Sequence, residues 1–300
     1  MRIFVTGASG WIGSPTVTRL ITAGHEVVGL ARSDQTAAVV TDLGADVVRG
    51  SLDDVDLLRE EATKSEGVVH LGFRHDVAFS GDYQAAADSD RLAIEAFGDA
   101  LDGSGKPLVI ASGTLGVAPG RLATERDVPD PGAHPRSANA QLALSLVARG
   151  VRTAIVRFAP TVHGEGDSGF IATLVDIARE SGFSGYVDDG GNRWTAVHRL
   201  DAADLVHRAV ERAPAGSVLH ATGEDGVEIR AVAEAIGRQL GVPTKSVPAA
   251  ETYPHFRFLA GFIGMDAPAS SAITRELLDW NPCGPGLVED LDAGRYTSGS

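Results

Sequence analysis

A glycine-rich segment at residues 6–13 constrains the fold of this chain more than any other feature. It reads Thr-Gly-Ala-Ser-Gly-Trp-Ile-Gly and lies between a short apolar run at residues 2–6 and a run with helical spacing of apolar residues. In a strand–turn–helix unit, Gly7 permits the tight turn, Gly10 lets the backbone approach a pyrophosphate, and Gly13 allows close helix–strand packing. The helix start offers free N–H groups and a positive dipole end to the phosphates. The segment therefore predicts a dinucleotide-binding βαβ unit.

Short apolar runs alternate with helical patterns along the first half of the chain. We expect strands at residues 2–6, 26–30, 46–49, 67–71, 107–111 and 153–158, and helices at residues 11–23, 34–43, 55–62, 83–101 and 137–149. Such alternation indicates a parallel sheet buried on both faces, and right-handed crossovers make it doubly wound. The predicted fold class is α/β, with a Rossmann-type doubly wound parallel sheet and a smaller C-terminal substrate lobe.

The end of the second predicted strand indicates which dinucleotide is bound. An acidic residue there would bond the ribose 2′-OH of NAD, whereas an arginine accommodates the 2′-phosphate of NADP. Here Arg32 and Ser33 follow the strand, and the first carboxylate, Asp34, comes only at the next helix start. Because a guanidinium suits a phosphate dianion, we predict NADP(H). The alternative is that Arg32 is a solvated surface residue.

The composition of the chain changes near residue 162, since glycines are dense between residues 164 and 191. We therefore expect an NADP-binding Rossmann domain at residues 1–162 and a substrate-binding lobe at residues 163–300. A predicted strand at residues 194–198 and a helix at residues 200–212 are expected to return to the main domain.

Composition and charge argue against several other classes of protein. The net charge is −14 and no stretch concentrates lysine or arginine, so we expect no nucleic-acid partner. The only cysteine, Cys283, excludes an internal disulfide and a cysteine zinc site. The nine histidines are scattered, and the closest pair, His70 and His75, fits no metal-ligand pattern. No apolar run approaches about 18 residues and no signal peptide is evident, so we expect a cytoplasmic protein without a membrane partner.

Further segments, in the same order along the chain, resemble the extended branch of the short-chain dehydrogenase/reductase superfamily. They are the glycine-rich segment, the turn at residues 49–54, the strand at residues 68–73, the Ala-Ser-Gly-Thr at residues 111–114, the strand and turn at residues 157–164, and residues 194–201. With the residues discussed above, the resemblance gives these cofactor-binding candidates: Gly7, Ser9, Gly10, Trp11, Ile12, Gly13, Arg32, Ser33, Ser51, Leu52, Leu71, Gly72, Phe73, Arg136 and Phe158.

One departure from that family concerns its proton donor. The resemblance implies a tyrosine four residues before a lysine, and counting back from Arg157 places this pair near Pro131 and Pro135. No tyrosine in the chain has a lysine four residues later. The chain is therefore similar to atypical members that keep the nucleotide site and lack the pair. Arg136 is placed to bond the nicotinamide ribose, but an arginine guanidinium stays protonated in proteins, which excludes it as a proton donor.

Two residues are candidates for catalysis. Ser112 ends the predicted fifth strand, where ligands bind in open α/β sheets, and we expect it to hydrogen-bond the substrate; the alternative is that it only tethers a loop. His163 follows the sixth strand, and histidine titrates near neutrality, so it is our candidate acid. The alternative for His163 is a structural hydrogen bond. His134 and Tyr186 are further candidates, and an iminium substrate would need no proton donor.

The C-terminal lobe is rich in aromatic residues, which is typical of an apolar ligand cleft. We predict that Thr114, Tyr186 and Trp194 line the substrate pocket. The predicted function is NADPH-dependent reduction of a C=O or C=N bond in an apolar small molecule. One alternative is a non-catalytic NADP-sensing protein; another is an NAD-dependent epimerase or dehydratase. Pairing through the helices at residues 83–101 and 137–149 would give a homodimer.

Overall fold

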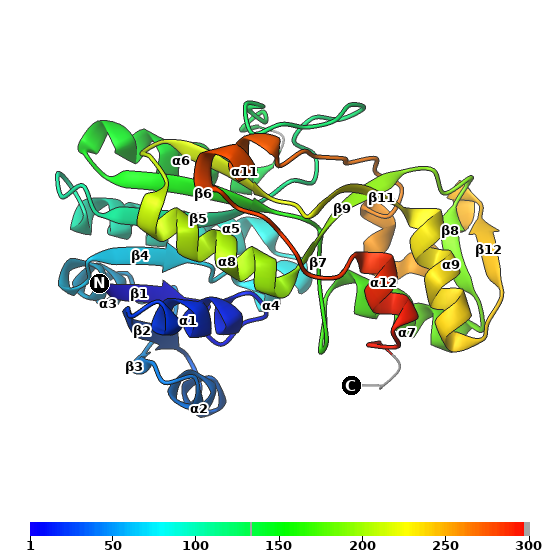
Figure 1. Ribbon diagram of the computed structural model, residues 1–300, viewed down its shortest axis with the longest axis horizontal. Coiled ribbons are helices and arrows are strands. Elements are labelled where there is room, and N and C mark those ends of the chain that lie inside the picture. The colour runs from blue at the N-terminus through cyan, green and yellow to red at the C-terminus, as the bar shows by residue number, and fades with distance from the viewer. Residues whose placement is uncertain (133, 297–300) are drawn as a thin grey trace.

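The computed structural model describes residues 1–132 and 134–296, in which strands and helices alternate (Figure 1). Seven strands form the main sheet in the order β10-β6-β5-β4-β1-β2-β3, and every pair in it is parallel. The strands are β1 (Arg2–Thr6), β2 (Glu26–Ala31), β3 (Asp46–Arg49), β4 (Gly67–His70), β5 (Pro107–Gly113), β6 (Arg152–Phe158) and β10 (Ser217–Ala221). The sheet order reverses at β1, next to β4, so the predicted doubly wound fold class is confirmed.

Helices cover both faces of the main sheet. They are α1 (Gly13–Thr22), α2 (Asp34–Asp42), α3 (Val55–Lys64), α4 (His75–Phe79), α5 (Tyr83–Ala100), α6 (Pro135–Ser145), η1 (Leu146–Arg149), α8 (Arg199–Arg212) and α11 (Ala272–Leu278). On one face α1 packs against α8, and their apolar side chains share a core with β1 and β6. On the other face α3, α5 and α6 bury a second core. Burial on both faces explains why the strands read as continuous apolar runs.

The C-terminal lobe lies beyond one end of the main sheet (Figure 1). Its strands β11, β9 and β7 form one sheet in that order, and β12 pairs with β8. The elements are β7 (Thr161–His163), α7 (Phe170–Ser181), β8 (Ser184–Val187), β9 (Arg193–His198), β11 (Glu224–Glu228), α9 (Ile229–Leu240), β12 (Thr244–Val247), η2 (Ala249–Glu251), α10 (Thr252–Phe256), η3 (Arg257–Gly261) and α12 (Leu287–Asp292). A third core joins α7, α9 and α12.

The structure corrects one detail of the predicted domain division. Helix α8 returns to the main sheet, where it packs against α1. The strand expected to return with it, β9, pairs instead with β7 and β11. The strand that does return is β10, which pairs with β6 and buries its last three residues. The chain therefore crosses between the two parts more than once.

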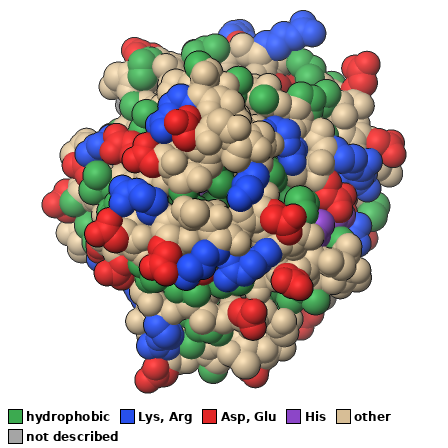
Figure 2. Space-filling model, turned by 90° about the vertical axis from the view of Figure 1, so that its left-hand side faces the viewer, with side chains coloured by type: hydrophobic (Ala, Val, Ile, Leu, Met, Phe, Trp, Pro, Cys, Tyr) green, Lys and Arg blue, Asp and Glu red, His purple; other side chains and the backbone are tan. Residues whose placement is uncertain are grey.

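The surface is mixed in charge. On the face that Figure 2 shows, basic and acidic side chains are interspersed rather than segregated. Ion pairs such as Arg149 with Asp99 and Asp102 join neighbouring elements. Within residues 1–132 and 134–296, no helix combines the length and hydropathy that a membrane span requires.

Candidate active site

The glycine-rich segment joins β1 to α1 at the C-terminal edge of the main sheet, and close packing explains two of its glycines. Gly7 has a φ of +70°, and a Cβ there would lie 2.8 Å from the backbone nitrogen of Gly72. A Cβ on Gly13 would lie 1.9 Å from the carbonyl oxygen of Gly7. A Cβ on Gly10 would meet only that oxygen, at 3.1 Å. The outer side of Gly10 is therefore open to a ligand.

The start of α1 is available to an anion. Its N-cap residue, Ile12, makes no side-chain capping bond, and the first turn has no acidic residue. The unsatisfied N–H groups and the dipole of such a helix end favour a phosphate. Ser9 is half-buried beside this cradle. The cradle fits the diphosphate of a dinucleotide.

Trp11 connects the cradle to the C-terminal lobe. Its indole Nε1 donates to the carbonyl oxygen of Val162 at 2.7 Å, and the guanidinium of Arg199 lies 3.9 Å from the ring centroid. A guanidinium stacked on the ring in this way restricts the orientation of the indole. We therefore expect Trp11 to fix how the lobe meets the nucleotide site.

Arg32 lies after β2, as predicted, but it is already paired. Its Nη1 donates to Asp76 Oδ2 at 2.8 Å. Hydrogen bonds from Arg74 and from Arg32 lower the pKa of Asp76 to about 2. Ser33 is the N-cap of α2, and its hydroxyl accepts from the backbone N–H of Thr36 at 3.2 Å. A 2′-phosphate would have to displace Asp76 from Arg32.

The remaining predicted cofactor residues differ in exposure. The hydroxyl of Ser51 donates to Asp54 at 3.1 Å, whereas Leu52 and Phe158 are each 7% exposed. Leu71 follows β4, and its N–H donates to the carbonyl oxygen of Thr6 at 3.2 Å. The side chains of Leu52 and Phe158 therefore support the site from the core.

A buried polar chain, which the sequence analysis missed, ties the cradle to α5 and α6. Thr6 Oγ1 lies 2.6 Å from His70 Nδ1 and accepts from the Gly72 N–H at 3.1 Å. His70 Nε2 lies 3.1 Å from Asp90 Oδ1, and Asn139 donates to Asp90 Oδ2 at 2.7 Å. Burial raises the pKa of Asp90, but its hydrogen bonds with His70 and Asn139 outweigh burial, so that the pKa is lowered.

Removal of the Asp90 carboxylate is expected to destabilise the protein strongly. Asp90→Ala leaves the buried partners His70 and Asn139 without their acceptor, and breaking a buried charged pair costs about 3–5 kcal/mol. Urea denaturation followed by circular dichroism measures the free energy of unfolding. The matched control is Asp88→Ala on the exposed side of α5, expected to change it by less than about 0.5 kcal/mol. Equal losses in both variants would contradict a structural role for the chain.

Four side chains meet beside the end of β5, and we call them the edge cluster: Phe73, Tyr83, His134 and Arg136. Arg136 Nη2 donates to the carbonyl oxygen of Ala111 at 3.0 Å, and its guanidinium lies 4.5 Å from the Phe73 ring centroid. The Tyr83 ring centroid lies 5.7 Å from that of Phe73 and 4.9 Å from that of His134. The half-buried Ser112 follows Ala111 directly. The structure thus places Arg136, Tyr83 and His134 beside the strand end that carries Ser112.

His134 is the N-cap of α6, immediately before Pro135. Its Nδ1 accepts from the backbone N–H of Arg136 at 3.3 Å, which leaves Nε2 as the nitrogen that carries the proton of the neutral ring. Partial desolvation and the charge of Arg136 lower the pKa of His134. Burial raises the pKa of Tyr83, although Arg136 opposes this. Tyr83 therefore stays protonated at neutral pH, while His134 titrates on the acid side of neutrality.

His163, the predicted acid, lies inside the lobe. It is fully buried on β7, its Nδ1 lies 2.7 Å from Asp290 Oδ2, and its ring centroid is 5.6 Å from that of His198. A general acid must reach the atom that it protonates. This position instead fits the alternative of a structural histidine that joins β7 to α12.

Two of the three predicted pocket residues are core residues. Thr114 is 2% exposed and its hydroxyl lies 3.0 Å from that of Thr195. Trp194 is 1% exposed and packs in the core of the lobe. The prediction that they line the pocket is wrong, because packing between the sheets buries both side chains. Tyr186 is half-buried on β8, and the guanidinium of Arg230 lies 5.6 Å from its ring centroid.

The sequence analysis did not identify an aromatic patch in the C-terminal lobe, which consists of Phe170, Phe258 and Phe262. The rings of Phe170 and Phe262 are stacked with centroids 6.0 Å apart. Phe258 is 48% exposed and Phe262 is 37% exposed. A Cβ on Gly116, which follows β5 and Ser112, would lie 3.9 Å from Met265. Exposed aromatic side chains suit an apolar ligand.

Comparison with known proteins gives relatives over almost the whole chain. The uncharacterized protein YLL056C of Saccharomyces cerevisiae is 43% identical over 296 residues, which cover 98% of each chain. A 4-hydroxy-2-methyl-3-oxo-4-farnesyl-3,4-dihydroquinoline-1-oxide ketoreductase of Stigmatella aurantiaca is 28% identical over 77% of this chain and 70% of its own length.

A solved structure shares the fold. It is the UDP-glucose-4-epimerase of Stenotrophomonas maltophila with bound NAD and formylated UDP-arabinopyranose, with a TM-score of 0.78 and 19% identity over 99% of this chain and 97% of that chain. Residues 3–221 match the NAD dependent epimerase/dehydratase family. The resemblance to the extended short-chain dehydrogenase/reductases is thereby confirmed. The chain belongs to the NAD dependent epimerase/dehydratase family, whose enzymes use a nicotinamide dinucleotide.

Proposed function

We propose that the protein is an NADPH-dependent reductase of a C=O or C=N bond in an apolar small molecule. The observation that carries this proposal is the edge cluster. It combines a titratable histidine, a tyrosine and an arginine with Ser112, at the same edge of the sheet as the glycine cradle. A ketoreductase among the relatives supports this reaction class.

The residues that would hold the cofactor form a continuous row along the strand ends. The cradle at residues 7–13 suits the diphosphate, Arg32 suits a 2′-phosphate, and Arg136 suits the ribose next to the nicotinamide. When bound, the reduced nicotinamide supplies a hydride to the substrate carbon. The protein must position that carbon and supply a proton to the oxygen or nitrogen.

In this proposal Ser112 orients the substrate oxygen and His134 supplies the proton. The hydroxyl of Ser112 donates a hydrogen bond to the substrate oxygen, which withdraws electron density from the carbonyl carbon. At acidic pH, protonation of Nδ1 replaces the bond that this nitrogen of neutral His134 accepts from the Arg136 N–H. The resulting imidazolium gives its Nε2 proton to the substrate oxygen, so that the ketone becomes an alcohol and the histidine becomes neutral with its proton on Nδ1. The Tyr83 ring packs against the imidazole, and the backbone N–H of Arg136 bonds Nδ1 of the neutral imidazole, so both position it.

The aromatic patch supports an apolar substrate. Phe258 and Phe262 expose apolar surface in the lobe, and Met265, which follows them in the chain, lies 3.9 Å from an added Cβ on Gly116 in the loop after Ser112. Burial of such surface by a ligand contributes about 25 cal/mol per Å². No cluster of basic side chains in the sequence suggests a nucleotide-sugar diphosphate.

The proposed function is tested with a substrate panel. Ketones, aldehydes and cyclic imines with apolar substituents are incubated with NADPH or NADH, and loss of the near-ultraviolet absorbance of the cofactor is followed. Turnover with NADPH, faster than with NADH, is the expected result. Tight NADPH binding without turnover of any class would favour an NADP-sensing protein instead. Release of an epimerised sugar nucleotide would favour the epimerase alternative.

Arg32→Ala is expected to weaken NADPH binding by roughly 10–100-fold, because a hydrogen bond to a charged group contributes about 1.5–3 kcal/mol. NADH binding should stay the same, since NADH has no 2′-phosphate. Asp76→Asn removes the competing carboxylate and should strengthen NADPH binding. Calorimetric titration with both cofactors measures these changes. Arg238→Ala, at an exposed arginine of the lobe paired with Asp292, is the control; a matching loss there would contradict a specific role for Arg32.

A further inference from the structure

Three potential metal ligands meet at the opposite edge of the main sheet from the edge cluster. His25 precedes β2, and His207 and Glu211 lie one turn apart near the end of α8. The Nε2 atoms of His25 and His207 each lie 3.1 Å from the same Glu211 oxygen, Oε1. One ligand atom from each of the three residues lies within 4.8 Å of the other two. The sequence analysis missed this group because His25 is far from the other two along the chain.

His207 is buried without the hydrogen bonds that a buried imidazole needs. The residue is 7% exposed, and neither of its ring nitrogens makes a hydrogen bond. Its contact with Glu211 is close in distance, but it does not have hydrogen-bond geometry. A buried polar group that makes no hydrogen bond destabilises the fold. A bound ligand would remove this destabilisation.

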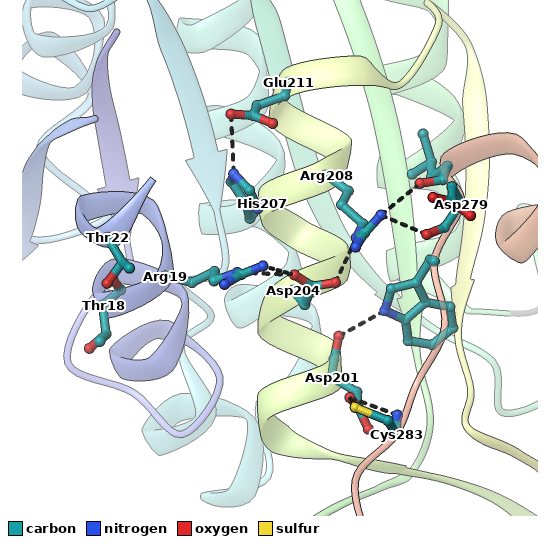
Figure 3. Close-up of polar contacts among 12 residues, drawn as sticks. Thr18, Arg19, Thr22, Asp201, Asp204, His207, Arg208, Glu211, Asp279 and Cys283 are labelled. Atoms are coloured by element: carbon teal, nitrogen blue, oxygen red, sulfur yellow. Dashed lines mark hydrogen bonds and ion pairs between the residues drawn. The ribbon is translucent and has the colours of Figure 1, made fainter. Parts of the chain in front are cut away.

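The arginines near Glu211 pair with another carboxylate, and the Glu211 carboxylate pairs with the two histidines. Figure 3 shows Arg19 and Arg208 both directed to Asp204, and Glu211 facing His207. Among residues 1–132 and 134–296, the ion pairs of Glu211 are those with His25 and His207. Within this described part of the chain, neither an arginine nor a lysine pairs with the Glu211 carboxylate, so a cation between the three side chains would meet its negative charge.

We propose that His25, His207 and Glu211 bind a divalent transition-metal ion of the Zn²⁺ type. Two imidazoles and one carboxylate form a donor set that suits Zn²⁺ and leaves a fourth position for water. Ligand bonds of about 2.0–2.1 Å place tetrahedral ligand atoms about 3.3 Å apart, close to the two 3.1 Å contacts. The pair at positions i and i+4 of α8 lies on one helical face.

Binding requires one local rearrangement. The terminal ammonium group lies 3.4 Å from His25 Nδ1. When His25 Nε2 binds the metal, its ring proton moves to Nδ1, so the amino terminus must move away. The bound metal would cross-link the turn before β2 to α8. The site therefore stabilises the nucleotide-binding half of the protein and takes no part in the proposed reduction.

The test is a titration of the metal-free, untagged full-length protein with Co²⁺ alone, followed by visible absorption and by competition with Zn²⁺. We expect one equivalent to bind with the intense d–d bands of a four-coordinate site. Glu211→Gln and His25→Gln should each weaken binding by at least about tenfold. His255→Gln, which removes a histidine from the lobe, should leave binding unchanged.

A second measurement separates ligation from folding. Zn²⁺ should raise the melting temperature of the native protein and of His255→Gln, and it should not raise that of Glu211→Gln. Circular dichroism of Glu211→Gln without metal should match that of the native protein, because the side chain is 31% exposed. Absence of Co²⁺ binding at micromolar concentration, or equal binding by all variants, would overturn the proposal.

Discussion

Substitution of Gly10 by valine is expected to weaken NADPH binding by at least about 100-fold while the protein stays folded. A Cβ at this position would meet a single atom, the Gly7 oxygen at 3.1 Å, so the fold accommodates it with a small shift. Its methyl groups would fill the space through which the diphosphate approaches the N–H groups of α1. The loss of two hydrogen bonds to the charged diphosphate, at about 1.5 kcal/mol each, corresponds to this weakening of about 100-fold.

Gly13→Ala gives a sharp contrast. Its Cβ would lie 1.9 Å from the Gly7 oxygen, a clash between two backbone segments that no rotamer relieves. We expect this variant to lose both nucleotide affinity and thermal stability. Gly264→Ala is the control, because nothing lies within 4 Å of its added Cβ. Calorimetric titration and thermal denaturation of the three variants measure affinity and stability separately.

The contrast between the two glycines makes the experiment decisive. Native affinity in Gly10→Val would mean that the diphosphate does not rest on the start of α1. The dinucleotide site inferred from the glycine spacing would then be wrong, even though the fold is the one expected. A loss of stability in Gly10→Val equal to that in Gly13→Ala would remove the distinction between a packing glycine and a binding glycine.

The nucleotide half of the fold was predictable because its signals are local. The spacing of Gly7, Gly10 and Gly13 follows from contacts within a single strand–turn–helix unit. Apolar runs of about five residues predict strands in any sheet that helices cover on both faces. The strand order then follows from right-handed crossovers and short connections.

The lobe was less predictable because its chain crosses back to the main sheet. Strand β9 and strand β10 are both short and apolar, and nothing in their sequences shows which sheet each joins. For the same reason Trp194 reads equally well as the wall of a pocket or as a core residue. Only the packing of α7 and α9 around it settles that it is buried.

The candidate proton donor depended on contacts between distant segments. His163 follows a strand in the expected place, but Asp290, 127 residues later, holds it in the interior. His134 precedes Pro135 in a proline-rich loop, where no local pattern indicates which side chains lie beside it. In the structure it is the N-cap of α6, and Tyr83 and Arg136 lie beside it.

His134→Gln is expected to lower kcat for ketone reduction by about 100-fold at acidic pH, within the range of general acid catalysis. The protonated imidazole is the donor, so the rate follows its population. Because partial desolvation and Arg136 hold the pKa of His134 below its ordinary value of 6.5, the native rate should rise as the pH falls below neutrality and level off below that pKa. In His134→Gln the rate should be nearly independent of pH in this range.

The substrate itself provides the sharper control. A cyclic iminium carries its positive charge before hydride transfer and needs no proton afterwards, so its reduction should be almost unaffected by His134→Gln. His75→Gln tests specificity, because burial also lowers the pKa of His75 and its ring centroid lies 5.1 Å from that of Phe73. If His75→Gln flattened the ketone profile and His134→Gln did not, the proton would come from another group. If both substrates lost rate equally in His134→Gln, the histidine would position the substrate or the cofactor rather than supply a proton.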